Sequence, residues 1–195
     1  RATNRKSNQS DVKQKRETLL EVRNLASPGK LAPISIELKA GEVLGIAGLL
    51  GSGRSELLHC IFGADPAASG EVLLAGKRVK KSTMASVAAG LALVPEDRFG
   101  QGLVRDFEIW RNATLPALDK VSFKNFVLSS RNEYQVGLDS IRRLSIKAHS
   151  PNVLVSELSG GNAQKVTIAK WLFSDVKVFL LDEPTVGIDI GTKTE

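Results

Sequence analysis

The segment Gly48-Leu-Leu-Gly-Ser-Gly-Arg-Ser55 decides the fold that this sequence predicts. It lies between the apolar run 43–48, which is typical of a buried strand, and a helical pattern over 55–62. A strand, a glycine-rich turn and a helix in this order form the usual loop that cradles phosphates. The glycines let backbone N–H groups turn inward without Cβ clashes, and the helix start adds its partial positive charge at the same point. The segment therefore predicts a site for the phosphates of a nucleotide.

Position 54 departs from the usual phosphate-loop pattern, because this sequence has arginine where lysine is normal. Arg54 keeps the positive charge but is longer, planar and forked, whereas lysine offers a compact ammonium that fits inside the loop. We expect nucleotide binding to survive in weakened form and hydrolysis at this loop to be slowed or lost. A glycine-rich turn without a ligand is the alternative for this segment taken alone. The loop residues expected to bind the nucleotide are Gly48, Gly51, Ser52, Gly53, Arg54, Ser55 and Glu56.

The segment Val178-Phe-Leu-Leu-Asp-Glu-Pro184 ends an apolar strand pattern with two acidic residues. Ligand sites in parallel sheets lie at the carboxyl ends of the strands. We predict that Asp182 binds Mg²⁺ directly or through water, together with the hydroxyl of Ser55. Glu183 is placed to polarise the attacking water as a general base. Two acids that simply end a buried strand are the alternative, which this segment alone leaves open.

A third segment, Leu158-Ser-Gly-Gly-Asn162, opens the helical pattern 162–173. Its serine and two glycines are predicted to form an N-cap with exposed amides, which suits both helix capping and an anion. A plain cap needs no second glycine, and two consecutive glycines permit close approach of a phosphate from outside this domain. The apolar face predicted for the helix consists of Val166, Ala169, Leu172 and Phe173.

The remaining patterns predict an α/β fold. Strand patterns cover 19–23, 34–38, 43–48, 71–76, 91–95 and 177–181, and helical patterns cover 55–62, 84–89, 131–144 and 162–173. Few strand signals occur between about 96 and 156, so we interpret that region as an inserted helical lobe. Cys60 is the only cysteine, which excludes an internal disulfide, and its place in a helical pattern predicts a core position.

The net charge of +6 belongs mainly to one end of the chain. Six basic residues and one acidic residue lie in 1–16, so the remaining residues carry only +1. This polar, non-periodic stretch is typical of a solvated linker rather than a nucleic-acid-binding arm. The sole methionine is Met84, and we expect the 195 residues to be a fragment of a longer chain with its C-terminal part missing. The apolar run 43–51 is far shorter than the roughly 18 to 20 residues that cross a bilayer.

In this order, the three segments resemble those of the ATP-binding cassette (ABC) family, and the resemblance covers essentially everything after the linker. The third segment resembles the family signature, which usually ends in glutamine where this chain has Asn162. Together with Arg54 and Val94-Pro-Glu-Asp-Arg98, this asparagine resembles more narrowly the second cassette of tandem ATPases in bacterial importers of simple sugars such as ribose, xylose or galactose.

The resemblance implies an α/β P-loop NTPase cassette with an inserted α-helical subdomain and a small antiparallel β subdomain. Residues 1–17 would be the basic linker from a first cassette. The truncated nucleotide-binding domain would cover 18–195, with the helical subdomain at approximately 96–168.

The resemblance also implies residue roles. Glu96 stands where most cassettes have a glutamine that senses the γ-phosphate and contacts the permease, so it joins Glu183 as an expected catalytic residue. Asp189 looks like part of the loop that crosses the interface between cassettes. Two cassettes of this family face head to tail, and each ATP lies between the phosphate loop of one and the signature of the other. The signature residues expected to bind ATP are Ser159, Gly160, Gly161 and Asn162.

The implied function is that of an ATP-hydrolysing subunit that couples ATP and Mg²⁺ binding to import of a monosaccharide. Its expected partners are a first cassette in the same chain, integral-membrane permease subunits and, indirectly, a periplasmic sugar-binding protein. These partners would place it at the cytoplasmic face of the bacterial inner membrane. A regulatory nucleotide-binding module that hydrolyses little is one alternative, motivated by Arg54 and Glu96. A cassette ATPase acting on ribosomes or DNA is another, but the near-neutral folded region argues against nucleic acid as a partner.

Overall fold

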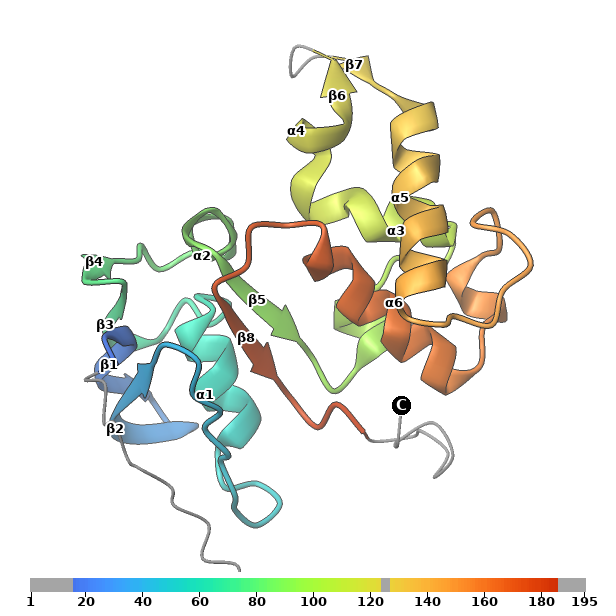
Figure 1. The fold of residues 1–195 in the computed structure, drawn as a ribbon. Helices are drawn as coiled ribbons and strands as arrows, with labels where there is room; N and C mark the ends of the chain where they lie inside the picture. The colour runs from blue at the N-terminus through green and yellow to red at the C-terminus, as the bar shows by residue number, and fades with distance from the viewer. Residues whose placement is uncertain (1–15, 124–126, 186–195) are drawn as a thin grey trace, which may run out of the picture.

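The computed structural model describes residues 16–123 and 127–185, which Figure 1 draws in colour. Its strands are β1 (Thr18–Ser27), β2 (Leu31–Lys39), β3 (Ser69–Leu74), β4 (Lys77–Arg78), β5 (Leu91–Val94), β6 (Ser122–Phe123), β7 (Val127–Leu128) and β8 (Val178–Leu181). The first four form an antiparallel sheet in the order β2-β1-β3-β4. Alternation along β1 turns Leu20 and Val22 into the core and leaves Glu21 between them less buried. The small antiparallel subdomain predicted from the family resemblance is confirmed.

Strands β5 and β8 lie side by side as a parallel pair in the centre of the molecule (Figure 1). Three helices belong to this part of the fold: α1 (Arg54–Ile61), α2 (Thr83–Ala89) and α6 (Gly160–Leu172). Every residue of β5 is buried, because α2 and α6 both contact it. Val94 lies opposite Leu181 at the end of the ladder, so both strands finish at the same edge. The residues that follow them are therefore brought together.

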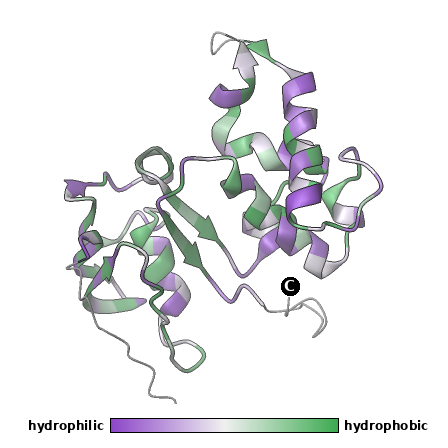
Figure 2. Ribbon diagram, viewed as in Figure 1, coloured by the Kyte–Doolittle hydropathy of each residue, from purple (hydrophilic) through white to green (hydrophobic). Residues whose placement is uncertain are grey.

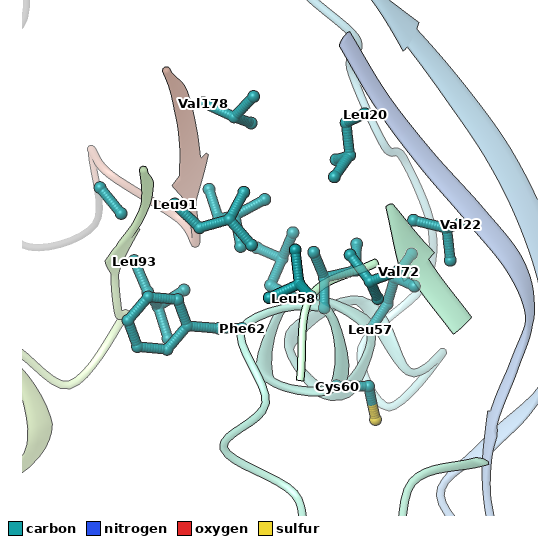
Figure 3. Close-up of a cluster of buried hydrophobic side chains, with 14 of the residues drawn as sticks. Leu20, Val22, Leu57, Leu58, Cys60, Phe62, Val72, Leu91, Leu93 and Val178 are labelled. Atoms are coloured by element: carbon teal, nitrogen blue, oxygen red, sulfur yellow. The ribbon is translucent and has the colours of Figure 1, made fainter. Parts of the chain in front are cut away.

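Helix α1 and the strands around it enclose the larger hydrophobic core (Figure 3). In Figure 3, Leu58 and Phe62 face β5 and β8, while Leu57 lies toward Val72 of β3. Cys60 on the same helix is buried, and burial raises the pKa of its thiol. Its predicted core position is confirmed. Figure 2 colours the chain by hydropathy and shows β5 and β8 among the most hydrophobic segments.

The run 43–48 forms no strand, so the prediction of a buried strand there is wrong. Val43 is 97% exposed, and Leu44 and Ile46 are also exposed. A strand needs a neighbour that pairs with its backbone N–H and C=O groups. Strand β8 pairs with β5, and a cavity of about 280 Å³ lies between β8 and residues 43–46 in place of a hydrogen-bonded ladder. The hydropathy pattern indicated burial, but the described residues supply no pairing partner.

The chain between β5 and α6 is mainly helical, as the sparse strand signals predicted. It contains η1 (Arg98–Gly102, a π-helical turn), α3 (Ile109–Thr114), η2 (Leu115–Ala117), α4 (Leu118–Val121), α5 (Ser130–Arg143) and η3 (Val155–Glu157). Figure 1 shows α3, α5 and α6 gathered on the side of the β5–β8 pair opposite to the antiparallel sheet. A second hydrophobic core forms there around Ile109, Val155 and Val166. The boundaries at 1–17, 18–195 and about 96–168 stay predictions, and 1–15 lie outside the described residues.

Helix α6 packs into both cores. Val166 is fully buried in the second core, whereas Trp171 is 5% exposed and belongs to the larger one. The Nε1 of Trp171 donates a hydrogen bond of 2.9 Å to the carbonyl oxygen of Leu93 in β5. Its ring also meets that of Phe62 edge-on, with 6.1 Å between the ring centres. Trp171 therefore fixes the end of α6 to the central strands.

The apolar face predicted for this helix is only partly correct. Val166 and Ala169 are buried, but Leu172 is 44% exposed. Trp171 is buried in the place that was expected for Leu172. A single stripe of period 3.6 assumes one partner surface. Because α6 contacts two cores, its buried residues do not follow one stripe. Within 16–123 and 127–185, no helix combines the length and the hydropathy needed to cross a bilayer.

Lys170 lies beside Trp171 where α6 meets η1. Its Nζ donates a hydrogen bond to the carbonyl oxygen of Gly102 and lies 5.1 Å from the centre of the Trp171 ring. Burial lowers the pKa of Lys170 from its ordinary 10.5 to about 8. The folded protein therefore disfavours the charged form of this lysine.

We expect the free energy of unfolding to rise between about pH 8 and 10, relative to Lys170→Met, by about 1 kcal/mol per pH unit. In this interval the unfolded chain still binds the Lys170 proton that the folded chain has released, so a higher pH favours the folded state. Denaturant unfolding of the intact protein and of the variant, at several pH values, measures the difference. An identical pH dependence in both would contradict the lowered pKa.

Candidate nucleotide-binding site

The turn before α1 has a backbone that requires glycine. Gly53, the N-cap residue, has φ of 88°, and a Cβ there would lie 3.2 Å from the carbonyl oxygen of Lys30. A Cβ at Gly48 would overlap the Ser52 side chain. The amide of Leu57 donates to the Gly53 carbonyl at 2.9 Å and closes the first helical turn. The N–H groups of residues 54–56 precede this bond, so the helix itself offers them no acceptor.

Arg54 extends from the start of α1 to the acidic residues after β8. Its Nη1 lies 2.8 Å from Oε1 of Glu183, and the two side chains are 31% and 36% exposed. Glu183 has φ of 42°, a left-handed conformation that costs a non-glycine residue about 1–3 kcal/mol and persists only where its surroundings fix it. The substituted loop residue is thus paired with the residue predicted to be the general base.

Asp182 continues the parallel ladder by one residue, since its amide donates to the Val94 carbonyl at 2.9 Å. It is only 4% exposed. Together with Arg54 and Glu183 it lines the cavity of about 280 Å³ that also touches residues 43–46. Three residues predicted from two separate segments therefore share one cavity.

The residues around Asp182 fit a hard cation. Within 16–123 and 127–185, its carboxylate has no hydrogen-bond donor and no cationic partner. A buried carboxylate is costly unless a charge or a metal compensates it. Mg²⁺ prefers oxygen ligands and is commonly held by one or two carboxylates together with substrate phosphates. Asp182 supplies such a carboxylate in the cavity, whereas Ser55, whose hydroxyl is the same kind of oxygen donor, lies on the second residue of α1 and does not line that cavity.

The signature segment forms the start of α6, and Ser159 takes the N-cap position. Its carbonyl accepts the Ala163 amide at 2.9 Å, but its side chain makes no capping hydrogen bond. Instead, Nδ2 of Asn162 donates to the Ser159 Oγ at 2.8 Å. Oδ1 of Asn162 accepts the Lys147 amide at 2.8 Å, which fixes the orientation of the side-chain amide. The hydroxyl proton of the exposed Ser159 is therefore available to a ligand.

Sequence reasoning missed the contacts that hold the signature segment. Nη1 of Arg98 donates to the Gly160 carbonyl at 2.7 Å. The backbone amide of Lys147, in the loop after α5, donates to Oδ1 of Asn162. Neither contact has a local pattern that could have indicated it, because both join residues that are distant in sequence. Among the described residues, the signature segment does not line the cavity of Arg54 and Asp182.

Glu96 and Glu183 occupy equivalent positions. Each lies two residues beyond its strand, β5 or β8, and Val94 pairs with Leu181 at the strand ends. Glu96 is exposed at this edge. Asp189, with the interface loop predicted around it, lies outside the described residues.

Comparisons of the sequence identify relatives. The family described as "ABC transporter" matches residues 31–186. The ribose import ATP-binding protein RbsA of Geobacillus kaustophilus is 43% identical over 180 residues, which are 92% of this chain and 36% of that protein. The protein of the same name from Chromobacterium violaceum is 47% identical with the same coverage. The chain thus spans about a third of the length of these curated relatives.

Solved structures agree on the fold. A dimeric structure of the ATP-binding cassette MJ0796, in a post-hydrolysis state with ADP and Pi, has a TM-score of 0.75 at 22% identity and covers 90% of this chain and 78% of that one. The cbiO1 protein of Clostridium perfringens, part of an ABC transporter complex, has a TM-score of 0.68 at 25% identity, covering 91% and 70%. Since the family match extends from β2 to the residues after β8 and includes both acids, this chain belongs to the ABC transporter family.

Proposed function

We propose that this chain is an ATP-binding and ATP-hydrolysing domain of a bacterial importer of simple sugars. The observation that carries the proposal is the single cavity lined by Arg54 of the phosphate loop and by Asp182 and Glu183 after β8. Relatives above 40% identity are named ribose import ATP-binding proteins, which supports a monosaccharide as the transported substrate.

Each residue of the candidate site has a proposed role. The backbone amides at the start of α1 hold the phosphates. Ser55 and Asp182 would hold Mg²⁺, which neutralises phosphate oxygens when it is bound. Glu183 orients a water molecule and accepts its proton during attack on the terminal phosphate. Glu96, at the same sheet edge, would help to orient that water. Its carboxylate would also repel the phosphate more than the usual glutamine does.

The signature segment serves a different nucleotide in this proposal. A first cassette pairs head to tail with this one, and the hydroxyl of Ser159 with the amides of Gly160 and Gly161 contacts the ATP held by that cassette. Asp189 is proposed to lie at the interface. The separation of the signature from the cavity of Arg54 is compatible with this arrangement. One site would then turn over quickly and the other, which contains Arg54, slowly.

A groove between α1, β5 and the helical region is the proposed contact with the permease. It encloses about 520 Å³ and is lined by residues from both parts, among them Phe62, Leu93, Gln101, Leu115 and Lys170. A permease segment bound in this groove would move with α1 and β5 and with the helical region when ATP binds. This contact would keep the protein at the cytoplasmic face of the inner membrane, with the periplasmic sugar-binding protein on the opposite side.

A regulatory module that hydrolyses little is the second candidate, favoured by the Arg54–Glu183 ion pair. The guanidinium occupies a carboxylate oxygen that would otherwise accept a hydrogen bond from water. This reading assigns the domain nucleotide binding without catalytic turnover.

We expect the intact protein, reconstituted in vesicles with its permease and binding protein, to release phosphate from ATP and to support ribose uptake into the vesicles. Glu183→Gln is expected to lower phosphate release from this site without weakening nucleotide binding, because the amide does not accept the proton from water. Turnover and uptake by purified components measure the outcome. Binding of ATP without turnover would favour the regulatory module, and failure to bind nucleotide would contradict both candidates.

A further inference from the structure

Arg54 has one guanidinium and two chemically suitable partners. One is the Glu183 carboxylate, which it contacts at 2.8 Å. The other is the phosphate group expected at the start of α1, the helix on which Arg54 is the first residue. Both partners are anions that guanidinium binds through the same N–H groups. The ion pair occupies Nη1, so a bidentate phosphate contact through Nη1 and Nη2 requires Arg54 to release Glu183.

The phosphate and Glu183 would compete for Arg54 within one cavity. Arg54 and Glu183 both line the cavity of about 280 Å³, and each is about one third exposed, so a ligand in the cavity reaches both. A lysine has one compact ammonium in place of a planar fork and would engage the carboxylate less specifically. The substitution at position 54 therefore strengthens the pairing with Glu183.

We infer that the Arg54–Glu183 ion pair is a latch that nucleotide must displace, so that Arg54 sets both the nucleotide affinity of this site and the position of its general base. The inference rests on the proposed function, because it takes a nucleotide phosphate as the displacing anion. While the latch is closed, Glu183 is held by Arg54 and its Oε1 is occupied by the guanidinium. Arg54 acts here as a positioning residue for Glu183.

A double-mutant cycle tests the latch. ADP binding to the intact protein is measured by calorimetry for four forms: wild type, Glu183→Gln, Arg54→Lys and the double variant. ADP is the probe because it is not hydrolysed. We expect Glu183→Gln to raise affinity about two- to fivefold when Arg54 is present, the range of a partly exposed ion pair, and to change it little in the Arg54→Lys background.

Glu42→Gln is the matched control. Glu42 also lines the cavity, but its carboxylate accepts the Lys39 amide and does not contact Arg54. Removing this charge should change ADP affinity by the same factor in both backgrounds. A readout of catalysis accompanies the binding data, since Arg54→Lys is expected to raise the turnover of this site rather than lower it.

The outcomes separate the two hypotheses. If Glu183→Gln raises ADP affinity equally with arginine or lysine at position 54, only general charge removal acts and the latch is wrong. If Arg54→Lys lowers turnover, the positioning role is wrong as well. If no form binds ADP at this site, the proposed nucleotide-binding function itself fails.

Discussion

Replacing Ser159 with arginine is expected to abolish ATP turnover by the intact protein, with a loss of at least about 100-fold. Ser159 is exposed at the start of α6, and its hydroxyl proton is available because the oxygen accepts a hydrogen bond from Asn162. Arginine would remove this donor and place a long cationic side chain next to Gly160 and Gly161. If this signature completes the ATP site of the first cassette, the substitution eliminates the faster of the two sites. Phosphate release at saturating ATP measures the effect.

Ser156→Arg is the matched control for that substitution. Ser156 is an exposed serine three residues upstream, in η3, so the variant adds the same side chain outside the signature. It is expected to retain most of the turnover. Equal losses in the two variants would show that an added arginine disturbs this region generally.

The companion variant Arg54→Ala is expected to lower total turnover by less than about twofold, because the site that contains Arg54 is proposed to contribute the smaller share. Alanine removes both the phosphate contact and the ion pair with Glu183. The comparison with Ser159→Arg is decisive for the proposed asymmetry. If both variants are equally damaging, the idea of one fast and one slow site fails.

The second large effect is structural. Trp171→Ala is expected to lower the free energy of unfolding by about 3–5 kcal/mol. The substitution removes a nearly buried ring that packs on Phe62, and it leaves the Leu93 carbonyl without the indole donor. Because α6 carries Ser159 at its other end, loosening this contact also disturbs the signature. Denaturant unfolding of the intact protein measures the loss.

Leu172→Ala provides the control on the adjacent residue of the same helix. Leu172 is substantially exposed, so its truncation is expected to cost less than about 1 kcal/mol. Trp171→Phe should lie between the two, since phenylalanine keeps an aromatic ring but cannot donate to Leu93. A Leu172→Ala effect as large as that of Trp171→Ala would mean that the predicted single apolar stripe, and not the observed packing, describes this helix.

Local patterns predicted most elements correctly. The strands at 19–23, 34–38, 71–76, 91–95 and 177–181, and the helices at 55–62, 84–89, 131–144 and 162–173, all have counterparts in the structure within a few residues. Their signals come from alternation, helical periodicity and turn residues, which depend on neighbours in the sequence. The same reasoning failed at 43–48, because burial of a strand depends on a partner elsewhere in the chain.

The sequence by itself determined the chemical inventory of this protein: the glycine turn before α1, the acids after β8 and the Ser-Gly-Gly start of α6. Each of these is a short run whose backbone preference and functional groups are fixed by its own residues. Tertiary structure decided which of these groups meet. It paired Arg54 with Glu183, placed Asp182 in the same cavity, and held the signature through Arg98 and Lys147. Contacts between distant segments depend on how the elements pack, and no local periodicity encodes that packing.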